Sequence, residues 1–572
     1  MQQLPILQNA DAILKAAKTR RLVISSPPGS GKSTKVPQLL LDSGSQKGRI
    51  AVLQPRRIAA RLLAERVARE RGGGLGGEVG YRVRFDDRTG PGTRIIYETE
   101  GILLRELITD PALKNYSAII LDEFHERHIH GDLALAACLA LQKSARPDLL
   151  VAVMSATLDE KPLARYLGPC EIIQAQGRSY PVEISYCDSA AARLPVWDSA
   201  AETCARLSAA AGGHTLIFMP GAYEIAKTAA ALAKIPALAG FDIRPLHGEL
   251  PVSEQNAALA QSARRKIIIA TNVAETSLTI DGVTAVIDSG LAKIARFDGA
   301  RGLNTLFTEK IAAPSATQRA GRAGRVSPGV CARLWTEREN PYRPLALEPE
   351  ILRLELSETL INLKACGLAG FESLDWLDAP DRQSVLRAQA LLKTLGATGP
   401  AGELTAQGRV MARYPLHPRY SRMMIEAEKL GCARECALVA AAAQERSLRL
   451  NSARLDEICD TPLRSDLSAI VRALDFCAAS NFESHACRTA GLNPGAAASA
   501  CRAARKISGG AGNGGKNWPD LVSQCFLRAF PDRVAALLPG ESGRYQLPHG
   551  RRAALAASSA AAVGYKTVQF EE

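Results

Sequence analysis

The chain has 572 residues, of which 47% are hydrophobic, and a formal net charge of +13. This length and composition describe a globular protein of roughly three to five domains. The sequence contains no run of about 18 apolar residues and no signal-peptide layout, so we expect no membrane span and a cytoplasmic location. The positive charge suits a polyanionic partner such as RNA or DNA, and the 13 cysteines, whose closest spacing is Cys432 to Cys436, argue against a disulfide framework and a zinc site.

A strand predicted at residues 22–25 leads into the turn S-P-P-G-S-G-K-S-T at residues 26–34. Glycines let backbone N–H groups converge on phosphate oxygens, and a helix beginning near Lys32 points its positive dipole end at the anion. We expect Lys32 to reach the β and γ phosphates of a nucleotide and Ser33 to hold Mg²⁺. Ser26 departs from the usual pattern, which has glycine there. The expected nucleotide-binding residues of the turn are Pro28, Gly29, Ser30, Gly31, Lys32, Ser33 and Thr34.

A second strand, predicted at residues 118–121, ends in Asp122 and Glu123, with His125 two positions later. Asp122 can hold the water shell of Mg²⁺, and Glu123 can orient or deprotonate the attacking water. We therefore expect a metal site formed by Ser33, Asp122 and Glu123, and a catalytic set that includes Lys32, Asp122, Glu123 and His125. A single Asp-Glu pair is often a helix cap, but together with the upstream turn it predicts a nucleotide-hydrolysing motor.

Apolar runs alternate with helical stretches in two series, which is typical of two parallel α/β sheets separated by a cleft. The first series predicts strands at residues 22–25, 50–53, 94–97, 118–121 and 151–154, and the second at 215–219, 266–270, 285–287 and 332–335, with a link near residues 176–181. Helical periodicity follows from about residue 341 to about residue 507, and then a glycine-rich loop at 509–515. The rest is expected to be less regular and β-rich. Its last run, 569–572, is strand-like with nothing to pair against, which indicates a truncated or minimal C-terminal module.

Three features resemble the DEAH/RHA-type helicases of superfamily 2, and within them the bacterial HrpB branch. They are D-E-F-H at residues 122–125, the phosphate loop at 26–29, and A-F-P-D-R-V-A at 529–535. The resemblance implies an α/β fold with two tandem RecA-like parallel-sheet domains followed by a mainly α-helical C-terminal region. The implied domains are 1–177 and 178–340 (RecA-like, the second with a β-hairpin near 292–311), 341–412 (winged-helix-like), 413–507 (a ratchet-like helical bundle) and 508–572 (a flexible loop and short module).

The same resemblance implies roles for the remaining motifs. The residues expected to contact the nucleic-acid backbone are Arg56, Arg57, Arg84, Thr99, Gly221, His247, Thr271 and Asn272, and those expected to couple hydrolysis to movement are Ser155 and Thr157. The nucleotide side is expected to include Arg66, Thr276, Ser277 and Asp281. No phenylalanine near residues 257–263 completes a stack with Arg66, so base selectivity is expected to be poor.

Gln318 is expected to position the attacking water, and Arg322 and Arg325 to stabilise charge on the γ-phosphoryl group. The two arginines are three positions apart, which would place them on one helix face. Taken alone, this segment could equally be a basic helix on a solvated surface.

Together the motifs predict an ATP-dependent, Mg²⁺-requiring RNA helicase or translocase that moves 3′ to 5′ as the family does. Two alternatives stay open. One is a DNA helicase in repair or restart, because backbone contacts do not reveal whether a 2′-hydroxyl is sensed. The other is a nucleic-acid-binding scaffold that needs an activator, against which the catalytic set is intact. We expect ATP and Mg²⁺ as cofactors, single-stranded RNA or else DNA as partner, a monomer, no membrane partner, and a protein activator of the kind many family members need.

Overall fold

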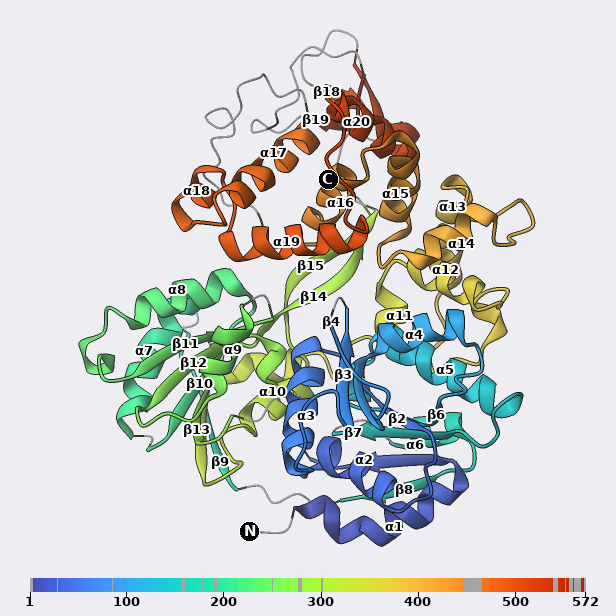
Figure 1. The fold of residues 1–572 in the computed structure, drawn as a ribbon. Coiled ribbons are helices and arrows are strands. Elements are labelled where there is room, and N and C mark those ends of the chain that lie inside the picture. Colours follow the sequence, from blue (N-terminus) through green and yellow to red (C-terminus); the bar gives the residue numbers. More distant parts are fainter. Residues whose placement is uncertain are drawn as a thin grey trace. The chain divides into compact units, whose positions relative to one another are not determined.

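The computed structural model describes residues 4–27, 29–84, 86–156, 160–175, 180–189, 193–210, 212–248, 250–275, 280–299, 302–445, 448, 465–538, 544–550, 552–554, 559 and 567–569. The chain divides into two compact units. The first comprises Met1–Glu355 and Phe371–Asp381, and the second Leu356–Gly370 and Arg382–Glu572. Figure 1 labels their helices and strands.

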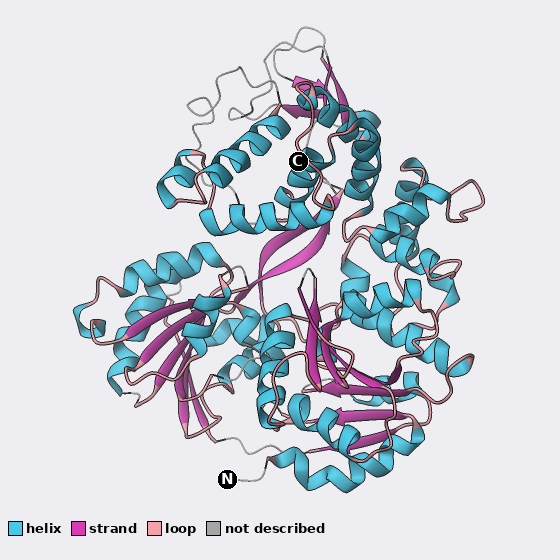
Figure 2. Ribbon diagram, viewed as in Figure 1, coloured by secondary structure: helices cyan, strands magenta, loops and turns pink. Residues whose placement is uncertain are grey.

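The first unit contains an eight-stranded sheet in the order β4-β3-β5-β2-β6-β7-β1-β8, parallel throughout except for the pair β3 and β4. Its strands are β1 (Arg21–Ser25), β2 (Arg49–Gln54), β3 (Val79–Val83), β4 (Asp86–Arg88), β5 (Ile95–Thr99), β6 (Tyr116–Leu121), β7 (Leu150–Ser155) and β8 (Glu171–Gln174). The helices of this part are α1 (Ala10–Ala16), α2 (Lys32–Asp42), α3 (Arg57–Glu70), α4 (Glu100–Thr109), α5 (Ile129–Lys143) and α6 (Glu160–Leu167). Figure 2 shows helices lying against the strands.

The strands predicted in this region correspond to β1, β2, β5, β6 and β7, in which nearly every side chain is buried. Apolar residues of α2 and α3, such as Val36 and Ala64, share one core with Ile24 and Ile120 of the strands. The sequence pattern missed β3, β4 and β8. Edge strands β4 and β8 have mostly exposed side chains, and Gly80 and Arg82 interrupt the apolar pattern of β3.

A second sheet of six parallel strands follows in the same unit, in the order β11-β12-β10-β13-β16-β9. Its strands are β9 (Val182–Tyr186), β10 (His214–Phe218), β11 (Asp242–Leu246), β12 (Lys266–Ala270), β13 (Val283–Asp288) and β16 (Gly329–Arg333), and its helices are α7 (Val196–Ala210), α8 (Ala222–Leu232), α9 (Val252–Leu259) and α10 (Ala313–Ala320). The four predicted strands correspond to β10, β12, β13 and β16. The missed strands β9 and β11 form the two edges. The expectation of two parallel α/β sheets is confirmed.

A hairpin leaves the second sheet between β13 and α10. β14 (Leu291–Asp298) and β15 (Leu303–Lys310) pair antiparallel, from Leu291 opposite Lys310 to Asp298 opposite Leu303. Ala292 and Ile294 at its base pack with Trp335. The hairpin occupies the segment where the resemblance implied one, and the short helix α11 (Glu350–Arg353) follows.

The second unit is mainly helical. Its helices are α12 (Ser357–Ala365), α13 (Arg382–Thr394), α14 (Ala406–Arg413), α15 (Pro418–Leu430), α16 (Ala433–Ala442), α17 (Asp466–Ala479), α18 (Ser484–Thr489), α19 (Pro494–Ile507) and α20 (Trp518–Ala529). Several begin where the sequence offers a cap, since the side chains of Thr405, Ser465 and Asn493 accept the backbone N–H groups that open α14, α17 and α19. No helix among the described residues has the length and apolar character needed to cross a membrane.

The structure of the C-terminal region differs from the sequence-based prediction in two respects. Helix α20 stands where a less regular segment was expected. A small antiparallel sheet follows, in the order β19-β18-β17-β20, formed by β17 (Val534–Leu537), β18 (Arg544–Gln546), β19 (Arg552–Ala554) and β20 (Thr567–Gln569). Gln569, expected to have nothing to pair against, lies opposite Val534 in β17. This pairing spans more than 30 residues of sequence, which a local pattern cannot reveal.

Candidate functional site

The phosphate loop connects the end of β1 to the start of α2. Gly29 and Gly31 have φ values of 87° and 91°, a backbone conformation that glycine adopts without strain. Ser26, which departs from the usual pattern, places its hydroxyl 2.8 Å from that of Ser30, and both side chains are buried. The substitution therefore adds a hydrogen bond inside the loop and leaves its phosphate-binding backbone geometry in place.

An acidic pair lies beside this loop at the carboxyl end of β6. Asp122 accepts hydrogen bonds from Gln54 Nε2 at 2.7 Å and from the backbone N–H of Glu123 at 2.9 Å, and the nearby Ser33 hydroxyl acts to lower the pKa of Asp122. Glu123 has a left-handed backbone (φ 52°) and holds Oε1 3.7 Å from Nζ of buried Lys32. The other oxygen, Glu123 Oε2, is buried and accepts no hydrogen bond from any residue that the structure describes.

Three oxygen-bearing side chains, those of Ser33, Asp122 and Glu123, thus lie next to the phosphate loop. Hydroxyl and carboxylate oxygens are the ligands that Mg²⁺ prefers, and Mg²⁺ usually keeps several of its waters. The unsatisfied Glu123 Oε2 offers an acceptor for such a water. The donor set therefore fits a magnesium–nucleotide complex.

His125 connects the acidic pair to two other motifs. Its Nδ1 lies 3.6 Å from Glu123 Oε2 and 3.5 Å from the backbone nitrogen of Ala156, the residue after buried Ser155 at the end of β7. Its Nε2 lies 3.2 Å from Gln318 Nε2 on α10. A single imidazole therefore joins the carboxylate, the end of β7 and the second sheet of the first unit.

The pKa values of Asp122 and Glu123 shift in opposite directions. Burial and the adjacent charge of Glu123 raise the pKa of Asp122. Burial would also raise the pKa of Glu123, but nearby basic groups hold it below its ordinary value; these are Lys32, His125, Arg322 and Arg56. Glu123 therefore stays ionised at neutral pH, as a residue that accepts a proton or orients water must.

Arg322 and Arg325 follow helix α10, which packs on the second sheet, and both interact with Glu123. Burial lowers the pKa of Arg322 well below its ordinary value and that of Arg325 to about 10, and Glu123 offsets part of this effect for both. The expectation that the two arginines share a helix face is wrong, because α10 ends at Ala320 and both lie in the turns that follow. Glycine, which is a poor helix former, stands at positions 321 and 324.

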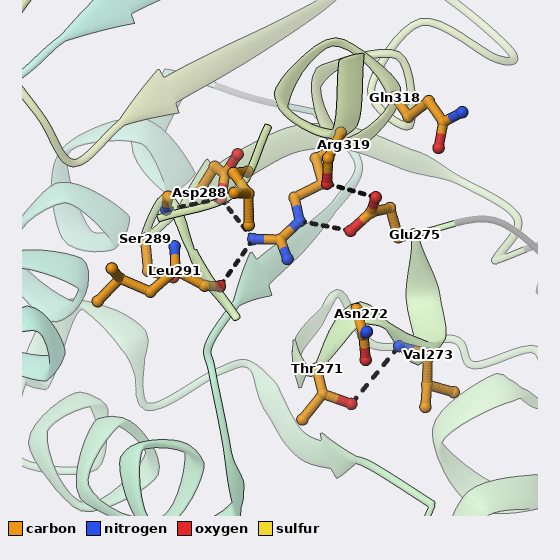
Figure 3. A network of polar contacts seen from close by, with 12 residues as sticks. Thr271, Asn272, Val273, Glu275, Asp288, Ser289, Leu291, Gln318 and Arg319 are labelled. Carbon is orange, nitrogen blue, oxygen red and sulfur yellow. Dashed lines mark hydrogen bonds and ion pairs between the residues drawn. The ribbon is translucent and has the colours of Figure 1, made fainter. Parts of the chain in front are cut away.

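Arg319 is a residue to which the sequence assigned no role. Its side chain is fully buried, and Figure 3 shows its guanidinium between Glu275 and Asp288. It donates to Glu275 Oε2 and Asp288 Oδ1, each at 2.8 Å, and to the carbonyl of Leu291 at 3.2 Å, where β14 begins. Arg322 Nε donates to the backbone carbonyl of the same Glu275 at 2.8 Å. Arg319 thus joins α10, β13 and the base of the hairpin.

Arg56, expected to contact a phosphate, has protein partners in this structure. Nη2 donates to Glu126 Oε2 and Nη1 to the carbonyl of Asn272, both at 2.8 Å. The guanidinium therefore links the two sheets of the first unit. Sequence reasoning gave Glu126 no role, since only the fold brings it to Arg56.

Most of the other expected nucleic-acid contacts lie at or just beyond the carboxyl ends of parallel strands, where ligands of such sheets bind. They are exposed Arg57 after β2, and half-buried Thr99, Gly221, His247, Thr271 and Asn272 at the ends of β5, β10, β11 and β12. The Thr271 hydroxyl accepts the backbone N–H of Val273 at 3.5 Å (Figure 3). Arg84 lies elsewhere, in the turn between β3 and β4.

The structure describes some, but not all, of the remaining residues that were expected to bind the nucleotide or to couple hydrolysis to movement. Thr34 donates its hydroxyl to the carbonyl of Gly31 at 3.2 Å. Arg66 is half exposed and pairs with Glu70 at 3.0 Å. Asp281 is exposed and interacts with Arg325. Pro28, Thr157, Thr276 and Ser277 lie outside the described residues.

Glu100, directly after Thr99, carries a pH-dependent prediction. Burial raises its pKa to about 8, although His128, whose Nδ1 lies 3.8 Å away, lowers it. Between about pH 5 and about pH 8 the unfolded chain ionises Glu100 while the folded chain keeps it protonated, so its contribution to stability falls as pH rises. We expect the melting temperature of Glu100→Gln to gain several degrees on the wild type across this window. Thermal unfolding at a series of pH values measures the gain, with exposed Glu254→Gln as control. A difference that is constant with pH would contradict the prediction.

Comparisons with known proteins agree with this geometry. Residues 7–165 match the DEAD/DEAH box helicase family and residues 199–327 the helicase conserved C-terminal domain. Residues 388–416 match the winged-helix part, and residues 417–482 the ratchet-like part, of the helicase associated domain HA2.

Individual relatives are similar over most of the chain. The ATP-dependent RNA helicase HrpA of Escherichia coli K12 is 39% identical over 457 residues, which are 77% of this chain and 34% of the relative. The ATP-dependent RNA helicase HrpB of the same organism is 35% identical over 570 residues, 98% of this chain and 65% of the relative. A crystal structure of the Escherichia coli DEAH/RHA helicase HrpB superposes with a TM-score of 0.81 at 34% identity, covering 96% of this chain and 66% of that one. The chain thus spans about a third of the HrpA relative and just under two thirds of the HrpB relative.

Proposed function

Since the chain belongs to the DEAD/DEAH box helicase family, we propose that it is an ATP-dependent RNA helicase that hydrolyses ATP to move along single-stranded RNA. The relatives HrpA and HrpB are named ATP-dependent RNA helicases, and that activity is proposed here for this chain. One observation carries the proposal: the phosphate-loop lysine and the acidic pair lie in contact, and basic residues from the second sheet act on the same Glu123. This is the arrangement that an ATPase needs when two sheets share one nucleotide.

Each residue then has a distinct task in hydrolysis. Lys32 and the backbone of the loop hold the phosphates, and Glu123 orients the attacking water and accepts its proton. Arg322 and Arg325 stabilise the charge that develops on the γ-phosphoryl group. Gln318, whose amide contacts His125, helps to position the attacking water. Ser33 and Asp122, with Glu123 through water, would hold Mg²⁺, which when bound neutralises phosphate charge.

The nucleotide site extends beyond these catalytic groups. Thr276, Ser277 and Asp281 are proposed on its second-sheet side, and Arg66 beside the base. Because no phenylalanine near residues 257–263 is present to stack on the base opposite Arg66, we predict poor base selectivity. The ratio of ATP to GTP hydrolysis at saturation measures it.

We place the nucleic acid at the carboxyl ends of the strands, on the backbone-contacting residues described above. Arg57, Thr99 and Thr271 offer a guanidinium, hydroxyls and backbone groups there, which contact phosphates and sugars without reading bases. Arg56 contributes through its link to Asn272. Sequence preference should then be weak, and affinity should fall steeply as salt rises.

Hydrolysis is coupled to movement in this proposal through Ser155 and Thr157. The backbone carbonyl of Ser155 accepts the backbone N–H of Ser26 at 3.0 Å, and the backbone nitrogen of Ala156 lies 3.5 Å from His125 Nδ1, so the end of β7 lies between the phosphate loop and the catalytic pair. A structural change at the γ-phosphate can therefore reach this segment through few intervening contacts.

We propose 3′-to-5′ movement, a monomeric state, a cytoplasmic location and dependence on a protein activator as further predictions.

The test is steady-state ATP hydrolysis without nucleic acid and with single-stranded RNA or DNA of matched length. We expect stimulation by RNA well above that by DNA, and a log–log salt dependence of RNA binding with a slope of about −0.7 for each phosphate contacted. Equal stimulation by DNA would replace the RNA helicase with a general or DNA-directed translocase. Tight RNA binding without hydrolysis would favour a scaffold.

A further inference from the structure

Three cysteines that are far apart in sequence meet in the second unit. Cys432 lies directly before α16, Cys436 lies one turn into it, and Cys525 lies on α20. Their Sγ atoms all lie within 4.8 Å of one another, and Cys432 Sγ and Cys525 Sγ are 3.7 Å apart. All three side chains are fully buried. The expectation that the cysteines are scattered holds along the chain but not in space.

We propose that Cys432, Cys436 and Cys525 form a binding site for a soft, thiophilic metal ion, with Cu(I) as the ion that fits. Sulfur ligands lie about 2.3 Å from an ion of this size, which separates two sulfurs by about 3.8 Å in a tetrahedral and about 4.0 Å in a trigonal arrangement. The 3.7 Å between Cys432 Sγ and Cys525 Sγ is close to both, and the other two separations are no more than 4.8 Å. A disulfide would need about 2.05 Å.

The number of ligands favours Cu(I) over Zn²⁺. Structural Zn²⁺ sites almost always have four protein ligands, whereas in the part of the chain that the structure describes this group has three members. The complete burial of the thiols leaves little access for water as a fourth ligand. Thiolates select soft ions, and Cu(I) is satisfied by two or three sulfur ligands.

The local structure supports thiolate ligation. Cys432 occupies the N-cap position of α16, a helix of 10 residues, and Cys436 lies one turn later on the same side of the helix. The positive end of a helix dipole stabilises a thiolate there. Each thiol that binds the ion as thiolate releases its proton. A bound ion would connect the start of α16 to α20 and stabilise the second unit, independently of ATP hydrolysis.

The test is anaerobic titration of the full chain with Cu(I) in competition with a Cu(I) chelator, followed by desalting and copper analysis. We expect one retained copper per chain and a thiolate-to-Cu(I) absorption band in the near ultraviolet. Cys436→Ser and Cys525→Ser should bind more than about 100-fold more weakly, because losing a ligand costs more than losing an outer-shell partner. Cys366→Ser, at a half-buried cysteine of the same unit, is the matched control and should bind like the wild type.

Several outcomes would overturn the site. They are no retained copper in the wild type, equal retention by the cluster variants, and retention of Zn²⁺ where Cu(I) is not retained. If a variant fails to fold, X-ray absorption at the copper edge of the loaded wild type decides the question. Three sulfur neighbours support the site, and nitrogen or oxygen neighbours in their place refute it. Pure core packing of three buried thiols predicts the first outcome.

Discussion

Glu123→Gln is expected to lower the kcat of ATP hydrolysis by about 10²–10⁴-fold and to leave ATP binding largely intact. The amide keeps the shape of the side chain but cannot accept a proton from water. In the wild type, basic neighbours keep the pKa of Glu123 below its ordinary value, so the carboxylate is ionised at neutral pH. Removing the charge also leaves Lys32, whose Nζ lies 3.7 Å from Glu123 Oε1, without its acidic partner. The ammonium group of Lys32 should then bind the phosphates at least as well as in the wild type.

Steady-state hydrolysis with saturating RNA, combined with nucleotide binding by fluorescence titration, separates the two effects. Glu171→Gln is a suitable control, because Glu171 is exposed on edge strand β8 of the same unit. A variant that retained more than about a tenth of wild-type kcat would show that Glu123 is not the group that accepts the proton. Loss of ATP binding together with hydrolysis would instead indicate a damaged site.

Arg319→Leu is expected to destabilise the first unit by about 3–5 kcal/mol, because removing one partner of a buried ion pair leaves the remaining charges uncompensated. Arg319 is fully buried between two carboxylates. One of these, Asp288, already has an oxygen, Oδ2, that accepts no hydrogen bond from any described residue. The variant would leave Glu275 and Asp288 buried without their shared cation.

Arg296 provides a matched control for this measurement. It also bridges two carboxylates, those of Glu309 and Glu348, but its side chain is 36% exposed. Arg296→Leu should therefore cost less than about 1 kcal/mol. Chemical denaturation followed by tryptophan fluorescence compares the two variants. Equal midpoints for both would contradict the assignment of Arg319 as the buried cation shared by Glu275 and Asp288.

Much of the fold could be predicted from short stretches of sequence. The apolar runs that became β1, β2, β6 and β7 are buried on both faces, so nearly every residue in them is hydrophobic and the pattern is unmistakable. Edge strands such as β8 and β9 have exposed residues and a weak pattern, and they were missed. The glycines at 321 and 324 were visible in the sequence, but the helix was still extended through them.

The sequence by itself determined the phosphate loop, the acidic pair and the buried central strands, because each depends on neighbours within a few residues along the chain. Only the tertiary structure decided which groups meet. His125 contacts Gln318, which is 193 positions away in the sequence, and Arg56 contacts Asn272, which is 216 positions away. Cys432 lies beside Cys525, which is 93 positions away. Such pairings depend on how sheets and helices pack, and packing is set by the whole core and not by local propensity.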